Sequence, residues 1–284
     1  EVPVMKKILS VLLTLGVIIG IFLYNHPSYL NLNSNSAPQI KTSKSDKALI
    51  DMKYDVDRYP ENYVKLNNNK VDLTQEDKAL LKDKGQSEFW VDYPQLDKLG
   101  RGGEVKALVT KDAVDNHASH NIKRPSFKSN VHIAGEYKDG QFDSQNQTWR
   151  GSNSNNAEMD SNGYHGWLYN KSHSLAWSLG GDMETHNLTL GTRAQNVGTN
   201  KAKEGGGMGY PETQIRNAMQ SKPNTKVYYD VKPVYNDDEL VPRGSHVRAY
   251  SVNDDGKTIN LNVWIFNAQD GIEIDYHTGE WRSA

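Results

Sequence analysis

The sequence predicts an α+β fold built around a central antiparallel sheet. The C-terminal part of the chain carries short runs rich in β-branched and aromatic residues, with few helical patterns between them. Asn253–Gly256 supplies the turn residues of a hairpin between two of these runs, which favours antiparallel pairing. The expected strands of this region are Val227–Tyr235, Val247–Val252, Ile259–Asn267 and Ile272–Tyr276.

The start of the chain predicts an export signal or a retained membrane anchor over residues 1–24. Met5-Lys6-Lys7 precedes an uncharged, mostly apolar run from Ile8 to Tyr24. Basic residues before such a run are typical of export signals, but no clear small-residue cleavage site follows, so both interpretations stay open. Residues 25–70 are polar and begin with an Asn- and Ser-rich stretch, which predicts a flexible linker. The folded domain is then expected to span residues 71–284.

Within that domain the helices and strands are assigned from their boundary residues. Thr74 and Asp77 form a capping-box pattern, which predicts a short helix. A second helix is expected after Pro211 and ends before Pro223, where proline cannot continue it. Two further strands are expected, at Glu88–Tyr93 and Val131–Tyr137. Leu240–His246 reads LVPRGSH, a thrombin cleavage sequence, and its place between expected strands favours a natural segment in an exposed loop.

Composition limits the kinds of function that this chain can have. It has 284 residues, of which 36% are hydrophobic, and this is enough for a packed core. There is no cysteine, which excludes thiolate nucleophiles, cysteine zinc sites and disulfides. The formal net charge of −2 gives no overall basic field, so any contact with nucleic acid must depend on a local basic groove.

The most informative segment runs from position 164 to position 212. His173 follows the strand-like run Tyr164–Tyr169, and a second such run, Asn187–Thr192, leads into Asn196. Glu212 then opens a helix. Histidine, asparagine and glutamate in this order suit a site that holds one hard metal ion beside one proton acceptor. That combination hydrolyses phosphodiesters.

Each residue type suits one part of this chemistry. A neutral imidazole, with an ordinary pKa of about 6.5, can take a proton from water near neutral pH. Mg²⁺ accepts few protein ligands and keeps most of its waters, and the amide oxygen of Asn196 is a suitable hard ligand. Glu212 can hold a metal-bound water in place. Lys171 and Arg193 flank the key positions and can contact phosphates.

These residues also have purely structural explanations. An isolated histidine such as His173 often hydrogen-bonds a turn, and asparagine at a position such as Asn196 can cap a helix. Pro211 followed by Glu212 is an ordinary helix start. The functional interpretation depends on the ordered set and on the sequence around it.

The segment resembles the DNA/RNA non-specific endonucleases of the ββα-metal fold, especially their streptococcal branch of DNA-entry nucleases and streptodornases. The general family motif is D-R-G-H, and this chain has Asn170-Lys171-Ser172-His173. The continuations SLAWSLGGD and NLTLGTRAQNVGTN are also similar to that branch. The resemblance covers about Ser87 to Trp281. Asn170 and Lys171 depart from the acidic and arginine residues of the general motif, and Lys171 removes the expectation of a forked phosphate contact.

The resemblance implies specific roles for individual residues. It implies that His173 is the general base, that Asn196 is the metal ligand and that Glu212 supports the metal. It also places Asn187 near the metal, as a residue that contacts substrate, together with Lys171 and Arg193.

The function implied is that of an exported, Mg²⁺-dependent, sequence-independent endonuclease, with Mn²⁺ as a second usable ion. The expected substrate is DNA, with RNA left open, and the expected products carry 5′-phosphates. Such a protein would be secreted, or anchored on the outer face of the cytoplasmic membrane. The alternative is a surface-anchored protein that binds nucleic acid, for uptake or adhesion, with little turnover. A tethered adhesin with no role in nucleic-acid binding is a third possibility. The sequence leaves the oligomeric state open.

Overall fold

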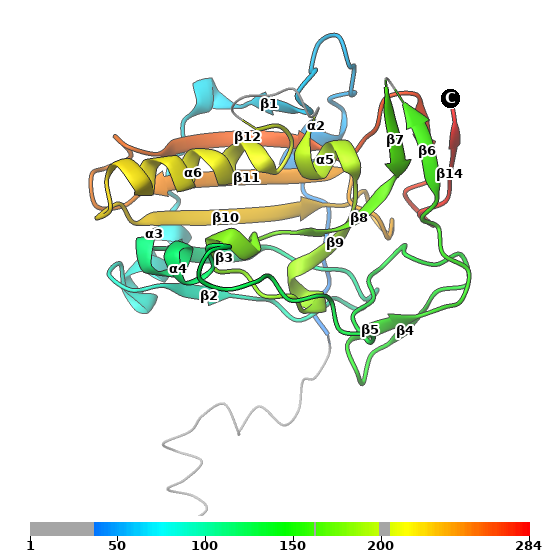
Figure 1. Ribbon diagram of the computed structural model, residues 1–284, viewed down its shortest axis with the longest axis horizontal. Coiled ribbons are helices and arrows are strands. Elements are labelled where there is room, and N and C mark those ends of the chain that lie inside the picture. Colours follow the sequence, from blue (N-terminus) through cyan, green and yellow to red (C-terminus); the bar gives the residue numbers. More distant parts are fainter. Residues whose placement is uncertain (1–36, 162, 199–204) are drawn as a thin grey trace, which may run out of the picture. The chain divides into compact units, whose positions relative to one another are not determined.

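The computed structural model describes residues 37–161, 163–198 and 205–284. The expected export signal or anchor, residues 1–24, lies outside these ranges. Among the described residues, no helix combines the length and apolar character needed to cross a membrane. Residues 38–284 form one compact unit around a six-stranded antiparallel sheet (Figure 1). The α+β class with a central antiparallel sheet is therefore confirmed.

The long strands of the sheet lie where the sequence predicts them. The hairpin turn Asn253–Gly256 lies between β11 and β12, as expected. The last expected strand is shorter and pairs outside the main sheet, as β13 (Ile272–Ile274) with β14 (Trp281–Ser283). The main sheet has the order β1 (Tyr63–Lys65), β12 (Asn260–Phe266), β11 (Gly244–Ser251), β10 (Val227–Val234), β3 (Val105–Val109) and β2 (Trp90–Asp92).

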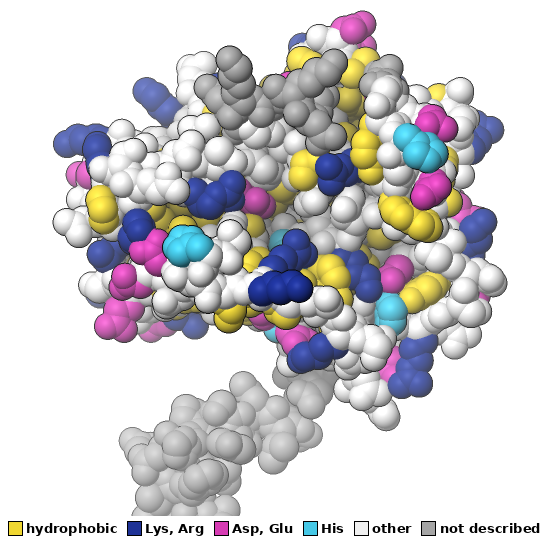
Figure 2. All heavy atoms as spheres, in the orientation of Figure 1, with side chains coloured by type: hydrophobic (Ala, Val, Ile, Leu, Met, Phe, Trp, Pro, Cys, Tyr) yellow, Lys and Arg dark blue, Asp and Glu magenta, His cyan; other side chains and the backbone are white. Residues whose placement is uncertain are grey.

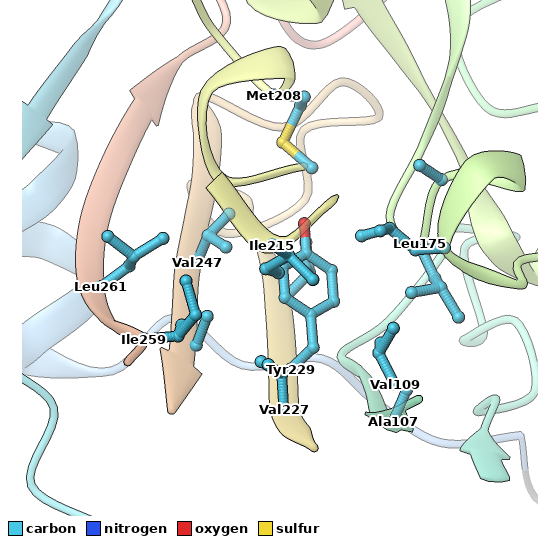
Figure 3. Close-up of a cluster of buried hydrophobic side chains, with 14 of the residues drawn as sticks. Ala107, Val109, Leu175, Met208, Ile215, Val227, Tyr229, Val247, Ile259 and Leu261 are labelled. Carbon is cyan, nitrogen blue, oxygen red and sulfur yellow. The ribbon is translucent and has the colours of Figure 1, made fainter. Parts of the chain in front are cut away.

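Helix α6 (Gly209–Ser221) covers one face of this sheet (Figure 1). It buries Ile215 and Met219 in the main hydrophobic core, which also contains Tyr229 of β10 (Figure 3). Tyr228, the neighbouring residue, packs in a separate cluster with α3 because side chains alternate between the faces of a strand. Complete burial of each apolar side chain contributes about 1.5–3 kcal/mol. The helix begins at Gly209, before the expected start, and Pro211 lies in its first turn, where no backbone N–H is needed.

The predicted capping box is present at the start of α3 (Gln75–Lys84). The Thr74 hydroxyl accepts a hydrogen bond from the backbone N–H of Asp77 at 3.1 Å. The Asp77 carboxylate in turn accepts one from the backbone N–H of Thr74 at 2.9 Å. The remaining short elements are α4 (Lys111–Asn116), β4 (Gln141–Asp143), β5 (Thr148–Arg150), β6 (Glu158–Ser161), β7 (Tyr164–Trp167) and the 3₁₀ turns η2 (Asn67–Asn69), η3 (Trp177–Leu179) and η4 (Thr185–Asn187).

The expected flexible linker, residues 25–70, is wrong over its described part. That part contains helix α2 (Lys44–Ile50) and strand β1, which pairs with β12 at the edge of the main sheet. Asp46 of α2 forms an ion pair with Lys232 of β10 at 2.8 Å. The segment is polar and has no periodicity, so its order comes from these contacts with the rest of the fold. The compact unit therefore begins at residue 38 and not at residue 71.

Two other expectations from sequence are corrected. Residues 131–137 form no strand beyond a single bridge from Tyr137 to Ser154. Gly135 interrupts the extended backbone with a φ of +80°. The thrombin-like segment 240–246 is not a free loop, since Val241 is fully buried and the segment runs into β11.

The segment that carries the candidate residues forms two strands followed by a helix. β8 (Tyr169–His173) pairs antiparallel with β9 (Leu188–Thr192), with His173 opposite Leu188. The chain then enters α5 (Arg193–Val197) directly from β9. Thr192 caps this helix by accepting a hydrogen bond from the backbone N–H of Gln195 at 2.9 Å. This unit lies beside α6 (Figure 1).

Candidate functional site

His173 is the last residue of β8, and its imidazole is half-buried. The ring stacks on Phe127 with 5.8 Å between centroids, and Nε2 lies 3.3 Å from the sulfur of Met183. Burial lowers the pKa of His173 to about 4, with a further contribution from the positive charge of Arg124. Asp182 opposes this shift through its charge and a backbone hydrogen bond. The imidazole is therefore neutral at pH 7 and able to accept a proton.

The loop after β8 is held in place by Asn187, which corrects the expectation that this residue contacts substrate. Asn187 is fully buried. Its amide nitrogen donates to the carbonyls of Leu175 and Asp182 at 2.9 and 3.0 Å, and its oxygen accepts from the Leu175 N–H at 2.8 Å. Asn187 thus closes the loop that carries Asp182 beside His173 and has no exposed surface for a ligand.

Asn196 lies on α5, close to the end of β8. Its Oδ1 is 3.5 Å from the hydroxyl of Ser172, the residue before His173. The Ser172 hydroxyl donates to Gln195 Oε1 at 2.8 Å, which fixes α5 across β8. Asn196 as a whole is half-buried.

Glu212 lies in the first turn of α6, which is tied to α5 by a hydrogen bond from Met208 N–H to the Gln195 carbonyl at 2.8 Å. Burial raises the pKa of Glu212 to about 7, and the charges of Arg216 and Arg124 oppose this shift only in part. Arg216 Nη1 lies 3.9 Å from Glu212 Oε2. A buried carboxylate of this kind is stabilised in its charged form by a nearby cation.

Arg124 is a functional candidate that sequence reasoning missed. Its guanidinium acts electrostatically on both His173 and Glu212, so these two residues lie near one positive charge. The side chain is exposed and lies over the ring of Phe127 at 5.7 Å. Arg124 lies in an irregular segment with no periodicity or motif, so no sequence signal distinguishes it from a solvated surface charge.

The two expected phosphate contacts occupy different surroundings. Lys171 lies on the same side of β8 as His173, since both side chains contact Phe127. Its ammonium forms an ion pair with Glu136 at 3.2 Å and donates to the carbonyl of Val131. Its charge is therefore largely compensated within the protein.

Arg193 lies at the start of α5, with its guanidinium 5.5 Å from the ring of Tyr164. It lines a hollow of 590 Å³ whose other walls include Glu61 and Gln269. His173, Asn196 and Glu212 do not line that hollow. The structure thus brings Lys171 beside His173 and directs Arg193 toward a separate depression.

The residues near Asn196 fit a metal ion that keeps most of its water. Across the described ranges, no group of three or more His, Asp or Glu side chains is arranged to hold a metal. An ion here would depend on the Asn196 amide oxygen, with Glu212 of the contacting helix α6 as a carboxyl group that is only partly ionised at pH 7. Mg²⁺ suits such a sparse oxygen site, because it binds through few protein ligands and several waters.

Basic side chains gather on the face that carries this unit. Figure 2 shows Lys and Arg side chains around the middle of that face, over α6 and the β8–β9 pair. This local concentration exists although the formal net charge of the chain is −2. This face can therefore attract a polyanion even though the protein as a whole carries no net positive charge.

Comparisons with known proteins identify related nucleases. A DNA/RNA non-specific endonuclease family model matches residues 141–253. A deoxyribonuclease from Streptococcus dysgalactiae subsp. equisimilis is 32% identical over 203 residues, which cover 66% of this chain and 59% of that protein. The chain therefore spans less than two thirds of that relative's length.

Two solved structures share the fold. The Sda1 nuclease, solved with a bound zinc ion, superposes with a TM-score of 0.66 and 30% identity, covering 82% of this chain and 100% of that chain. NucA from Streptococcus agalactiae, solved with a bound magnesium ion, gives a TM-score of 0.55 and 22% identity over 79% and 88% of the two chains. At 22% identity the second likeness concerns the fold alone. The chain belongs to the DNA/RNA non-specific endonuclease family.

Proposed function

We propose that the protein is an exported, Mg²⁺-dependent endonuclease that hydrolyses phosphodiester bonds of DNA without sequence preference. The observations that carry this proposal are the half-buried, neutral imidazole of His173 at the end of β8 and the contact of Asn196 with the neighbouring Ser172, in a chain of this family. Arg124 acts electrostatically on both His173 and Glu212. The name of the 32% identical deoxyribonuclease favours DNA as the substrate. The apolar run after Met5-Lys6-Lys7 supports export.

The residues divide the reaction between them. His173 takes a proton from water, whose oxygen attacks the phosphorus as the bond to the 3′ oxygen breaks. The departing 3′ oxygen takes a proton from a solvent water, which leaves a 5′-phosphate and a 3′-hydroxyl. Asn196 would supply the amide oxygen to the metal ion, and Glu212 would orient its waters. A bound ion would neutralise negative charge on the phosphate and on the leaving oxygen. Arg124 attracts the phosphate backbone toward His173.

Digestion of plasmid DNA and of RNA, side by side, tests this proposal. Each substrate is incubated with Mg²⁺, Mn²⁺, Zn²⁺ or chelator, using the wild type, His173→Ala and His277→Ala. His277 is an exposed histidine paired with Asp238, so it serves as a matched control. We expect metal-dependent smearing for the wild type and the control, and a loss of at least about 100-fold for His173→Ala.

The same gels separate the proposal from its alternatives. Plasmid that is retarded but intact with every ion would support a binding protein without turnover. Plasmid that is neither cut nor retarded would contradict both. Cutting that persists in chelator would contradict metal dependence.

A further inference from the structure

A second hollow, of 460 Å³, is lined in part by Arg216 and Gln220 of α6. Its walls combine apolar side chains with more cationic than acidic ones, Asp115 being the acidic residue in the lining. Trp177 and Ala118 line it, and Ile122 is 47% exposed there, among the largest exposed hydrophobic side chains of the described residues. Arg124 and Arg216 also line it. This chemistry suits an anion that carries a flat apolar group.

Two guanidinium groups connect this hollow with the candidate site. Arg216 lies 3.9 Å from Glu212, and its nitrogens also donate to the hydroxyls of Ser178 at 2.8 Å and Thr213 at 3.0 Å. Its guanidinium is therefore fixed at the boundary. Arg124 lines the hollow while its charge acts on both His173 and Glu212. A phosphate held between the two arginines could therefore belong to the same nucleic-acid strand as a phosphate positioned at His173.

We propose that this hollow binds one unpaired nucleotide of the strand being cut, next to the scissile phosphate. The base lies against Trp177 and Ile122, and its phosphate lies between Arg124 and Arg216. This inference rests on the proposed function and adds a subsite to it. The hollow has the size of a small-molecule pocket. Contact with an aromatic side chain accepts every base, in keeping with cutting that ignores sequence.

The subsite has a consequence for the choice of substrate. A base that is stacked and paired inside a duplex cannot enter a pocket without leaving the stack. Single strands and locally melted duplexes should therefore be cut faster than stable duplexes. The local basic groups attract both kinds of substrate, so the difference should persist when salt weakens binding to both.

The experiment uses single-stranded oligonucleotides in which every linkage but one is chemically protected. One version is complete, and two others lack the base on the 5′ or the 3′ side of the cleavable linkage. We expect removal of the base on one side to lower kcat/KM by about 5- to 100-fold, the range that stacking on an aromatic side chain contributes. Removal on the other side should have little effect.

Two variants test whether the hollow is responsible. Ala118→Trp fills it, and Ile122→Asp makes its exposed apolar wall polar, in case the larger side chain prevents folding. Both should cut the complete substrate more slowly and no longer distinguish it from the version without a base. Leu99→Trp is the matched control, because Leu99 is 39% exposed and lines a different hollow. It should keep the wild-type discrimination.

Binding measurements on His173→Ala separate this inference from the proposed function. If the wild type fails to cut, tighter binding of the complete oligonucleotide than of one version without a base would still support the subsite. Equal binding of all three would overturn it. If the wild type cuts but is indifferent to base removal on either side, the subsite is wrong and the proposed function stands. Discrimination that survives in both Ala118→Trp and Ile122→Asp would also overturn it.

Discussion

At the scale of single residues, the surroundings of His173 decide its protonation. Burial against Phe127 and the charge of Arg124 both disfavour the imidazolium, and the pKa falls to about 4. A pKa this far below 7 makes a weak base, although one that is fully available at neutral pH. A substrate phosphate next to the ring would raise its pKa, because negative charge favours the protonated form. In the proposed mechanism, the substrate would therefore strengthen the base that acts on it.

Arg124→Ala provides a test of this electrostatic coupling. Removing the cation should raise the pKa of His173, since the charged imidazolium is then less disfavoured. It should also raise the pKa of Glu212, since the carboxylate loses a stabilising charge. NMR titration of the two side chains measures both shifts, with Lys123→Ala as the neighbouring control. A fall in either pKa, or equal shifts in the control, would contradict the arrangement.

At the scale of elements, the candidate site depends on how closely α5 packs on β8 and β9. Gly191 of β9 faces the side chain of Gln195 on α5. A Cβ at this position would collide with Gln195 Oε1 and would lie 2.8 Å from the Cβ of Ser172. Those two side chains form the hydrogen bond that fixes α5 over β8. Glycine is required here because of this close approach, and not because of its backbone conformation.

Gly191→Ala should therefore move α5 away from β8 and displace Asn196. We expect the free energy of unfolding to fall by about 1–3 kcal/mol, the usual cost of overpacking. The molecules that remain folded should also cut DNA more slowly in the presence of Mg²⁺. Gly209→Ala is the control, since a Cβ there would meet only a backbone oxygen at 3.9 Å. Chemical denaturation and initial cleavage rates measure both effects. Full activity in Gly191→Ala would show that α5 does not position a functional group.

The elements that sequence predicts well are those with strong periodicity or clear boundary residues. Strands β2, β10, β11 and β12 of the main sheet belong to this class, as does α3 with its capping pair Thr74 and Asp77. The described part of residues 25–70 was misassigned because its short elements gain order only from contacts such as Asp46 with Lys232. Residues 131–137 alternate like a strand because an irregular segment also buries apolar residues there.

The part of the candidate site that could be predicted is the part whose residues follow one another in a single segment of the sequence. His173, Asn196 and Glu212 lie on β8, α5 and α6, and α5 contacts both of the other elements. Arg124 was not predictable, since its position depends on how a loop without a pattern folds back. The structural role of Asn187 depends on the turns around it, and a sequence does not reveal whether an amide is buried.

At the scale of the whole molecule, buried ion pairs join α3 to the central sheet on the face opposite α6. Arg248 of β11 donates to both Asp77 at 2.7 Å and Asp230, and the Tyr228 hydroxyl donates to Asp77 at 2.7 Å. Burial alone raises the pKa of Asp77, but the hydrogen bonds from Arg248, Thr74 and Tyr228 outweigh it and bring the pKa to about 2. This carboxylate therefore stabilises the fold in its charged form.

Asp77→Asn should destabilise the protein by about 3 kcal/mol at pH 7, because Arg248 loses a buried partner. The folded-state pKa lies below its ordinary value of 3.8, so the stabilisation is complete above that pH and is lost as the pH falls toward 2. The two proteins should thus converge in stability over that range. Urea denaturation at several pH values measures this, with Asp83→Asn, an exposed change on the same helix, as the control. A difference that stays constant down to pH 2 would contradict the assignment.

The most direct test of the central claim is chemical rescue of a variant that lacks the imidazole. His173→Gly should cut DNA at least about 100-fold more slowly than the wild type while it binds DNA equally well. Added imidazole should restore cutting, and the rescue should grow with pH as free imidazole loses its proton. An unimpaired His173→Gly protein, or an impaired one that imidazole does not restore although it binds DNA and Mg²⁺ normally, would contradict the assignment of His173 as the base.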